Sequence, residues 1–150
     1  MKSLLLACAL SVASLAANAE SFATGNLNYS ISQANGEVVL TLINKTPDVP
    51  ATLESVGLLF PSDEDRVHLM RNVDRSLGAR TEISLGKADA IAKLVDPMVD
   101  LVSWNTAASD LLPACHASKC DSKKFGVKIV LNYPNTVSQQ VLGGFMQYSR

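Results

Sequence analysis

The sequence predicts a mainly β protein, a two-layer β-sandwich with one or two helices inserted mid-chain. Two observations lead to this fold class. Apolar and polar residues alternate in segments near both ends of the region after residue 26, and a period of two is typical of half-buried strands. In the middle, segments 63–77 and 87–102 have apolar residues at helical spacing instead. An α+β fold is the alternative.

The amino terminus has the three parts of a secretory signal. Lys2 precedes an apolar stretch over residues 4–17, which ends in the small residues Ala17-Asn18-Ala19 before polar Glu20. The apolar run is shorter than the ~20 residues that a membrane-spanning helix needs. We therefore expect residues 1–19 to be a signal peptide that is cleaved before Glu20.

Residues 20–150 are expected to form a single globular domain. The formal charge of the full chain is −1, and loss of the signal removes one lysine and no acid, which gives −2. The basic excess typical of nucleic-acid partners is missing, and no second apolar run is long enough for a membrane span. We expect a periplasmic or secreted bacterial protein that does not bind nucleic acid and has no membrane span after cleavage.

Residues 27–44 predict a hairpin. Leu27, Tyr29 and Ile31 fall on one side of an extended chain, and a second alternating segment follows over residues 37–44. Between them, Asn35-Gly36 is the favoured pair for a tight turn because both positions tolerate positive φ.

A third strand is expected over residues 52–60, after a turn that contains Pro47 and Pro50. The order of an alternating strand, a proline-containing polar turn and an apolar strand resembles the early strands of immunoglobulin-like extracytoplasmic domains. The resemblance implies an immunoglobulin-like version of the sandwich.

Residues 63–77 are expected to be a helix. Ser62 can cap it, acidic residues occupy positions 63–65 and arginines lie toward its end, which is the charge order that a helix dipole favours. Apolar residues recur every four positions, at Leu69, Val73 and Leu77. A strand around residues 67–70 is the competing interpretation, because tertiary context can override local preference.

A short strand over residues 79–85 is followed by a second helical pattern over residues 87–102. Pro97 should kink this helix or end it at Asp96, because proline lacks the amide donor and crowds the preceding turn. Trp104 is expected to anchor the packing nearby.

The last third predicts a polar loop from Asn105 to Lys124 and then two strands, over 125–133 and toward the end of the chain. Pro134 and Asn135 fit the turn between them. Gly143-Gly144 in the last strand predicts a bulge or a close approach to the backbone.

The cysteines are interpreted from the expected compartment. Cys8 leaves with the signal, so Cys115 and Cys120 remain and are expected to form a disulfide, worth about 2 kcal/mol for so short a loop. With His116 they offer only three metal ligands, and a structural zinc site usually has four. The four residues between the cysteines also differ from the two of a redox motif. A metal site or a redox pair remain alternatives, and no cofactor is expected.

Catalytic motifs are missing from the sequence: there is no nucleophile elbow, phosphate loop, metalloprotease helix or dinucleotide fingerprint. His68 is expected to be a partly exposed helix residue, and the acids at 63–65 are explained by a helix start. We therefore expect that the protein is not an enzyme.

Four arginines within fifteen positions form a candidate interaction patch: Arg66, Arg71, Arg75 and Arg80. Guanidinium groups can bind anions or an acidic protein. The alternative is a solvated charged face that is partly neutralised by neighbouring acids.

These observations predict an exported, non-enzymatic protein-interaction or accessory module of the periplasm or cell surface, whose partner is another protein. One alternative is a subunit of a fimbria-like assembly, because the cysteine pair and Tyr148 near the end are similar to features of that family. The short cysteine spacing and Arg150 depart from it. The other is a metal carrier or small enzyme that uses the loop at 115–120 or methionines such as Met98 and Met146.

Overall fold

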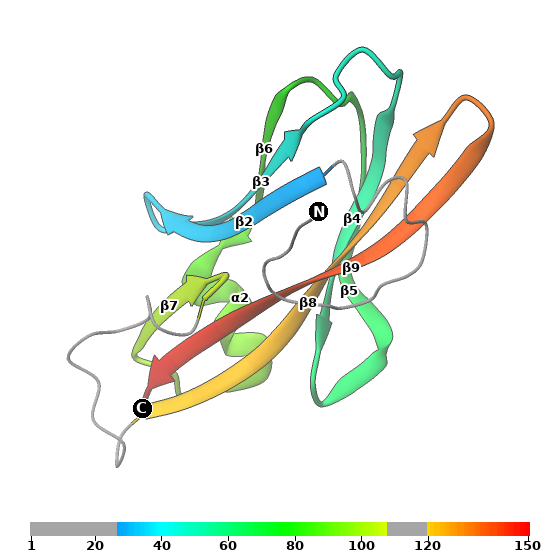
Figure 1. Ribbon diagram of the computed structural model, residues 1–150. Helices are drawn as coiled ribbons and strands as arrows, with labels where there is room; N and C mark the ends of the chain where they lie inside the picture. Colours follow the sequence, from blue (N-terminus) through cyan, green and yellow to red (C-terminus); the bar gives the residue numbers. More distant parts are fainter. Residues whose placement is uncertain (1–26, 108–119) are drawn as a thin grey trace.

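The computed structural model describes residues 27–107 and 120–150, which form two antiparallel sheets and one short helix. The smaller sheet has the order β2-β3-β6, and the larger has the order β5-β4-β8-β9-β7 (Figure 1). The mainly β, sandwich-like architecture expected from the sequence is confirmed. The bounds are β2 Leu27–Ala34, β3 Glu37–Asn44, β4 Thr52–Phe60, β5 Asp63–Ser76, β6 Arg80–Lys87, α2 Ala88–Val95, β7 Leu101–Asn105, β8 Cys120–Tyr133 and β9 Thr136–Ser149.

The predicted hairpin at residues 27–44 is present as β2 and β3. Ala34 pairs with Glu37 across the turn, and the two turn residues have positive φ, 54° at Asn35 and 77° at Gly36. This is the conformation that a two-residue turn between twisted strands requires. The local sequence alone determines this part of the fold.

The hydrophobic core lies between the inner faces of the two sheets and under α2. Trp104 is buried and makes a T-shaped contact with Phe125, with ring centroids 4.8 Å apart. The indole nitrogen donates a hydrogen bond of 3.3 Å to the Ala88 carbonyl, at the start of α2. Trp104 is therefore the packing anchor that the sequence predicts, although it lies in a strand, β7.

The helix predicted over residues 63–77 is wrong, because these residues form the edge strand β5, paired with β4. The pairing register shifts, and Leu69 and Asp74 have positive φ, 55° and 49°. As a result, the inward residues of β4 face His68, Arg71 and Arg75, which are spaced by three and four positions. The apolar residues that predicted a helix, Leu69, Val73 and Leu77, instead lie on or just after an irregular edge strand, where Leu69 is 49% exposed and Leu77 is buried.

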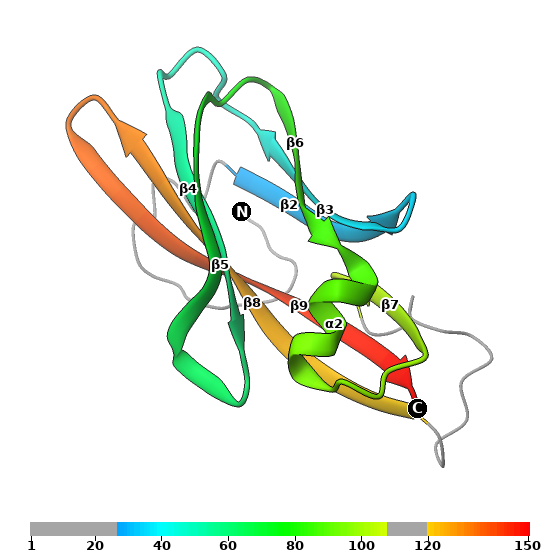
Figure 2. The same cartoon turned by 180° about the vertical axis from the view of Figure 1, so that it is seen from behind.

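The second predicted helix is shorter than residues 87–102 but ends where proline predicts. Helix α2 stops at Val95, and the Asp96 amide donates the last hydrogen bond, to Ala92. Figure 2 shows α2 beside the ends of β6 and β7. The expected loop from Asn105 to Lys124 is also too long, because β8 already begins at Cys120.

Side chains close the gaps between the edges of the two sheets. On one side, Arg71 and Arg75 of β5 donate hydrogen bonds to β6 carbonyls, those of Ser84 and Glu82; the Arg75 bond is 3.0 Å long. On the other side, the Ile31 backbone of β2 exchanges hydrogen bonds with the Thr106 hydroxyl, which lies just after β7. The sheets are therefore joined at both sides without a continuous backbone ladder.

The two adjacent glycines of β9 mark a close approach and not a bulge. The pairing of β8 with β9 runs without a shift from Cys120 to Tyr133. A Cβ added to Gly144 would lie 2.6 Å from the Phe125 ring, whereas one added to Gly143 would meet only the Tyr29 hydroxyl, at 4.0 Å. Gly144 therefore makes room for an aromatic ring in the core.

Candidate functional site

The outer face of the five-stranded sheet is the surface that departs most from the usual pattern. An antiparallel sheet of a sandwich commonly has an apolar inner face and a polar outer face. In β8, Val127 and Ile129 point inward and are fully buried. The alternate positions, Gly126 and Lys128, therefore lie on the outer face.

Two glycines on this face lie beneath aliphatic side chains of other strands. A Cβ added to Gly57 of β4 would be 2.2 Å from Val67 Cγ1 and 2.9 Å from Met70 Sδ. One added to Gly126 of β8 would be 2.6 Å from Val141 Cγ1 and 3.6 Å from Leu59 Cβ. Glycine in a strand interior is typical of such close approach. The outer face is therefore packed close to the backbone.

These contacts define a continuous apolar stripe that crosses β5, β4, β8 and β9. It consists of Val67, Met70, Leu59 and Val141. Both ends of the stripe are open to solvent, because Met70 is 47% exposed and Val141 is 43% exposed. Val137, further along β9, is 54% exposed. Aliphatic groups thus occupy outward positions where a solvated sheet would carry polar groups.

Two lysines interrupt the apolar character of this face. Lys128 pairs in register with Gly57 on one side and with Val141 on the other, so it lies next to the apolar stripe. Lys124 pairs with Phe145, and its ammonium group lies 6.0 Å from the centre of that ring. The ion pairs found in the described part of the chain use arginine and histidine as cations and neither of these lysines.

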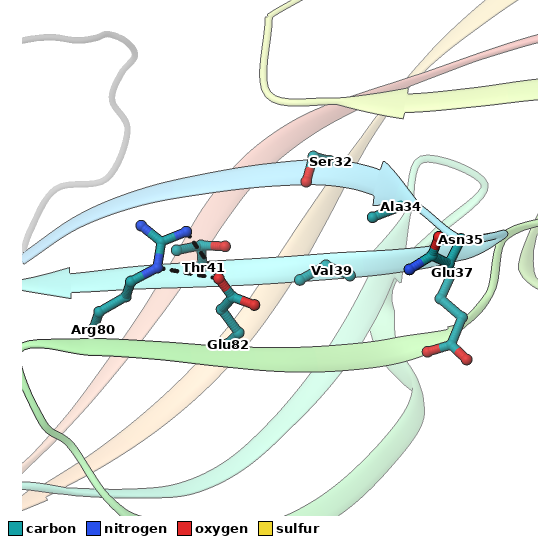
Figure 3. A pocket seen from close by; sticks show the side chains of 8 residues that line it. All are labelled: Ser32, Ala34, Asn35, Glu37, Val39, Thr41, Arg80 and Glu82. Carbon is teal, nitrogen blue, oxygen red and sulfur yellow. Dashed lines mark hydrogen bonds and ion pairs between the residues drawn. The ribbon is translucent and has the colours of Figure 1, made fainter.

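The outer face of the three-stranded sheet is different, because it holds a polar depression of about 350 Å³. Figure 3 shows Arg80 and Glu82 at one end of it and Asn35 and Glu37 at the other. Arg80 donates two hydrogen bonds to one Glu82 oxygen, at 3.1 and 2.8 Å. Glu37 accepts a hydrogen bond of 2.5 Å from the Ser84 hydroxyl. Arg80, Glu82 and Glu37 therefore each have a hydrogen-bond partner within this sheet.

The structure separates the four arginines of the candidate interaction patch. Arg71 and Arg75 bond to the β6 backbone, and Arg80 pairs with Glu82 on the other sheet. Arg66 is exposed on β5. Three of the four guanidinium groups therefore have intramolecular partners that explain their presence.

The predicted cysteine loop lies outside the described residues, apart from its last residue, Cys120. Cys120 is the first residue of β8, but Cys115 and His116 lie outside the described residues, as does the expected signal peptide. The methionines of the metal-carrier alternative lie in different surroundings, because Met146 is buried in the core and Met98 is 73% exposed. Within ranges 27–107 and 120–150, no group of three metal-ligating residues was found.

His68 lies in the β4–β5 hairpin and not on a helix. Its Nε2 atom is 3.4 Å from Asp63 Oδ2, and its ring centroid is 5.3 Å from that of Phe60. An imidazole that is tilted against the Phe60 ring and paired with one carboxylate is explained by packing within the hairpin.

A second charged cluster lies where α2, β8 and the end of β9 meet. Arg150 pairs with Asp96 and with Asp121, the latter at 2.5 Å. The hydrogen bond from Arg150 lowers the pKa of Asp96 below its ordinary value of 3.8, and the same bond raises the pKa of Arg150. Burial raises the pKa of nearby Tyr148. This cluster fastens the end of β9 to α2 and β8.

Sequence reasoning missed the apolar stripe, although two signals for it were present. Gly57 lies in the interior of a predicted strand, where glycine weakens the strand unless something approaches closely. Val137, Val141 and Phe145 recur every four positions of the last strand, on the face opposite the buried set. Both signals mark a second apolar face.

Comparison with known proteins identified no relative of this chain. No protein-family model matches the chain, and no curated protein or solved structure is similar to it at a significant level. In the part of the chain that the structure describes, no helix is both long and apolar enough to cross a membrane.

Proposed function

We propose that the protein is an exported, non-enzymatic interaction module of the periplasm or cell surface, which binds another protein through the outer face of its five-stranded sheet. The apolar stripe is the observation that carries this proposal. Aliphatic side chains that remain partly exposed on an otherwise well-packed sandwich are typical of a surface that a partner covers. The export part of the proposal rests on the signal-like residues 1–19.

The second sheet supports the choice of face. Its outer surface is polar, and Arg80, Glu82 and Glu37 are hydrogen-bonded within the sheet. A partner that bound there would have to break these bonds or leave them at its rim, where charge pairs contribute little. The apolar stripe offers surface that gains free energy when water is removed.

Affinity capture with matched variants tests the interaction. The mature protein is used as bait in extracts of the native envelope, beside Val141→Glu and Leu94→Glu. Leu94 is 56% exposed on α2, so the second variant makes the same chemical change away from the stripe. We expect a partner that the wild type and Leu94→Glu retain and that Val141→Glu loses. An identical set of captured proteins for all three baits would contradict the proposal.

Export is tested separately on the full-length chain. Amino-terminal sequencing of the protein from the periplasm or the medium should begin at Glu20. An uncleaved chain in the cytosol would contradict the proposed location. The binding face would still be tested by the capture experiment.

A further inference from the structure

We infer that the partner segment that covers this face combines apolar side chains with carboxylates, and that the carboxylates pair with Lys124 and Lys128. The inference rests on the proposed function and adds the chemistry of the partner. It follows from where the two lysines lie and from how the apolar stripe is built.

Lys128 would be part of the contact and not a distant surface charge. Its register neighbours are Gly57 and Val141, so a segment that covers the apolar stripe also covers the lysine stem. Covering an ammonium group without a partner costs free energy, because a charge loses its hydration. A carboxylate placed on the covering segment removes that cost.

Lys124 lies on the same face as Lys128 and is also paired with an apolar residue of β9, Phe145. It lies four residues before Lys128 on β8, and its ammonium group approaches the Phe145 ring. The long stems of lysine can pack on apolar surface while their charged ends stay at its rim. The face therefore presents an apolar centre with two cations beside it.

A second copy of the chain fits this face poorly. Two identical faces packed about a two-fold axis bring the same patch of both copies together. The lysines next to the centre of one copy would then approach those of the other, and like charges in an interface oppose association. Charge complementarity favours a different, acidic partner.

A membrane surface also fits less well than a protein. Val67, Met70 and Val141 lie close over the glycine backbone, so they do not form a projecting group that could enter the acyl region of a bilayer. A flat surface with side chains packed on it is suited to another packed protein segment.

A displayed library of random twelve-residue peptides provides a defined probe. The library is selected on the mature protein and counter-selected on Val141→Glu. We expect enriched peptides that combine Leu, Ile or Val with Asp or Glu. Their Kd should rise roughly tenfold when Lys124→Gln and Lys128→Gln are combined, as expected when two exposed charge pairs are lost.

Controls separate this inference from the proposed function. Lys93→Gln, on α2, should leave the Kd unchanged, and circular dichroism should confirm that every variant is folded. Raising the salt concentration from about 50 to about 300 mM should weaken binding in the wild type more than in the double lysine variant.

Five outcomes would overturn the inference. The enriched peptides could need Val141 but lack acidic residues, or they could bind the double lysine variant as well as the wild type. Either result would contradict a partner with carboxylates and would still agree with the proposed function. Failure to enrich any peptide counts against both. Binding to phosphatidylglycerol vesicles that Val141→Glu abolishes would replace the protein with a membrane. A dimer in sedimentation velocity that the same variant abolishes would replace it with a second copy.

Discussion

The two sheets of the sandwich share the same strand alternation but present opposite outer surfaces. On the three-stranded sheet, Arg80, Glu82, Glu37 and Ser84 bond to one another around a shallow depression. On the five-stranded sheet, glycines lie beneath aliphatic side chains, and two lysines have no acid beside them in the described ion pairs. On the first face, the polar groups are hydrogen-bonded within the sheet. On the second, covering the aliphatic side chains would remove apolar surface from water, which is favourable. Inner-face packing dictates neither outer surface, and the proposed partner would account for the difference between them.

The largest effect is expected from filling the space above a glycine on the five-stranded face. Gly57→Ala places a methyl group against Val67 and Met70, and such overpacking costs about 1–3 kcal/mol. Gly143→Ala, on the same face with only a distant neighbour, should change stability little. Urea denaturation of both variants measures the difference. Equal stability would mean that the side chains over Gly57 move aside freely.

A smaller effect is expected from the polar face. Ser84→Ala removes the hydroxyl that donates to Glu37, and one such hydrogen bond contributes about 0.5–1.5 kcal/mol. The denaturation midpoint should fall with an unchanged slope. Because the same hydroxyl accepts a hydrogen bond from the Gly86 amide, Ser84→Thr serves as the control that retains both groups. A midpoint that stays constant in Ser84→Ala would show that water replaces the bond fully.

Breaking the exposed pair on the polar face should cost less. Arg80 and Glu82 are both more than half exposed, and pairs of this kind contribute at most about 1 kcal/mol. Arg80→Gln should therefore lower stability slightly, and the loss should shrink further in high salt. A loss as large as that of Gly57→Ala would contradict the description of this face as solvated.

The Arg150–Asp96 ion pair can be compared with the Arg80–Glu82 pair, because its contribution to stability should depend on pH. Because the pKa of Asp96 is lowered in the folded protein, its stabilising effect is present above the ordinary value and is lost as the pH falls through the folded value. Arg150→Gln should lower the thermal midpoint at pH 7, and this difference should shrink as the pH falls below 3.8, the ordinary pKa of Asp96. Asp121→Asn is a control that leaves Asp96 paired. A difference that persists in acid would exclude the ion pair as its cause.

Val141→Ser is expected to have the smallest effect on stability and the largest effect on partner binding. Val141→Ser removes aliphatic surface from an exposed end of the apolar stripe, and substitutions at such positions usually change stability by less than about 0.5 kcal/mol. Thermal denaturation should be nearly unchanged while partner capture falls. A large loss of stability would mean that Val141 belongs to the packed fold and not to a docking surface.

Local patterns predicted the parts of this fold that depend on neighbouring residues. The Asn35-Gly36 turn, the strand at 52–60 and the stop before Pro97 follow from backbone chemistry within a few residues. Segment 63–77 was not predicted as a strand, because its structure comes from edge pairing with β4, whereas its own apolar residues recur at the spacing of a helix. The roles of Arg71 and Arg75 were equally hidden, since each bonds to a strand that alternation alone does not place beside it.

The candidate site could be only partly predicted for a similar reason. A glycine in a strand indicates a close approach, but the approaching side chain comes from a neighbouring strand. Gly57 meets residues of β5, and Gly126 meets Val141 of β9. The order of strands in the sheet therefore decides which aliphatic groups gather on the outer face. The sequence supplies the period of each strand but not this order.

The place of β8 and β9 in the sheet sets an order of events for a newly made chain. Both follow every other described strand in the sequence, yet they lie between β4 and β7. Until they emerge from the ribosome, β4 and β7 have no neighbour to complete the larger sheet. A polypeptide whose larger sheet is still incomplete can be threaded through a translocation channel, as the proposed secretion would require.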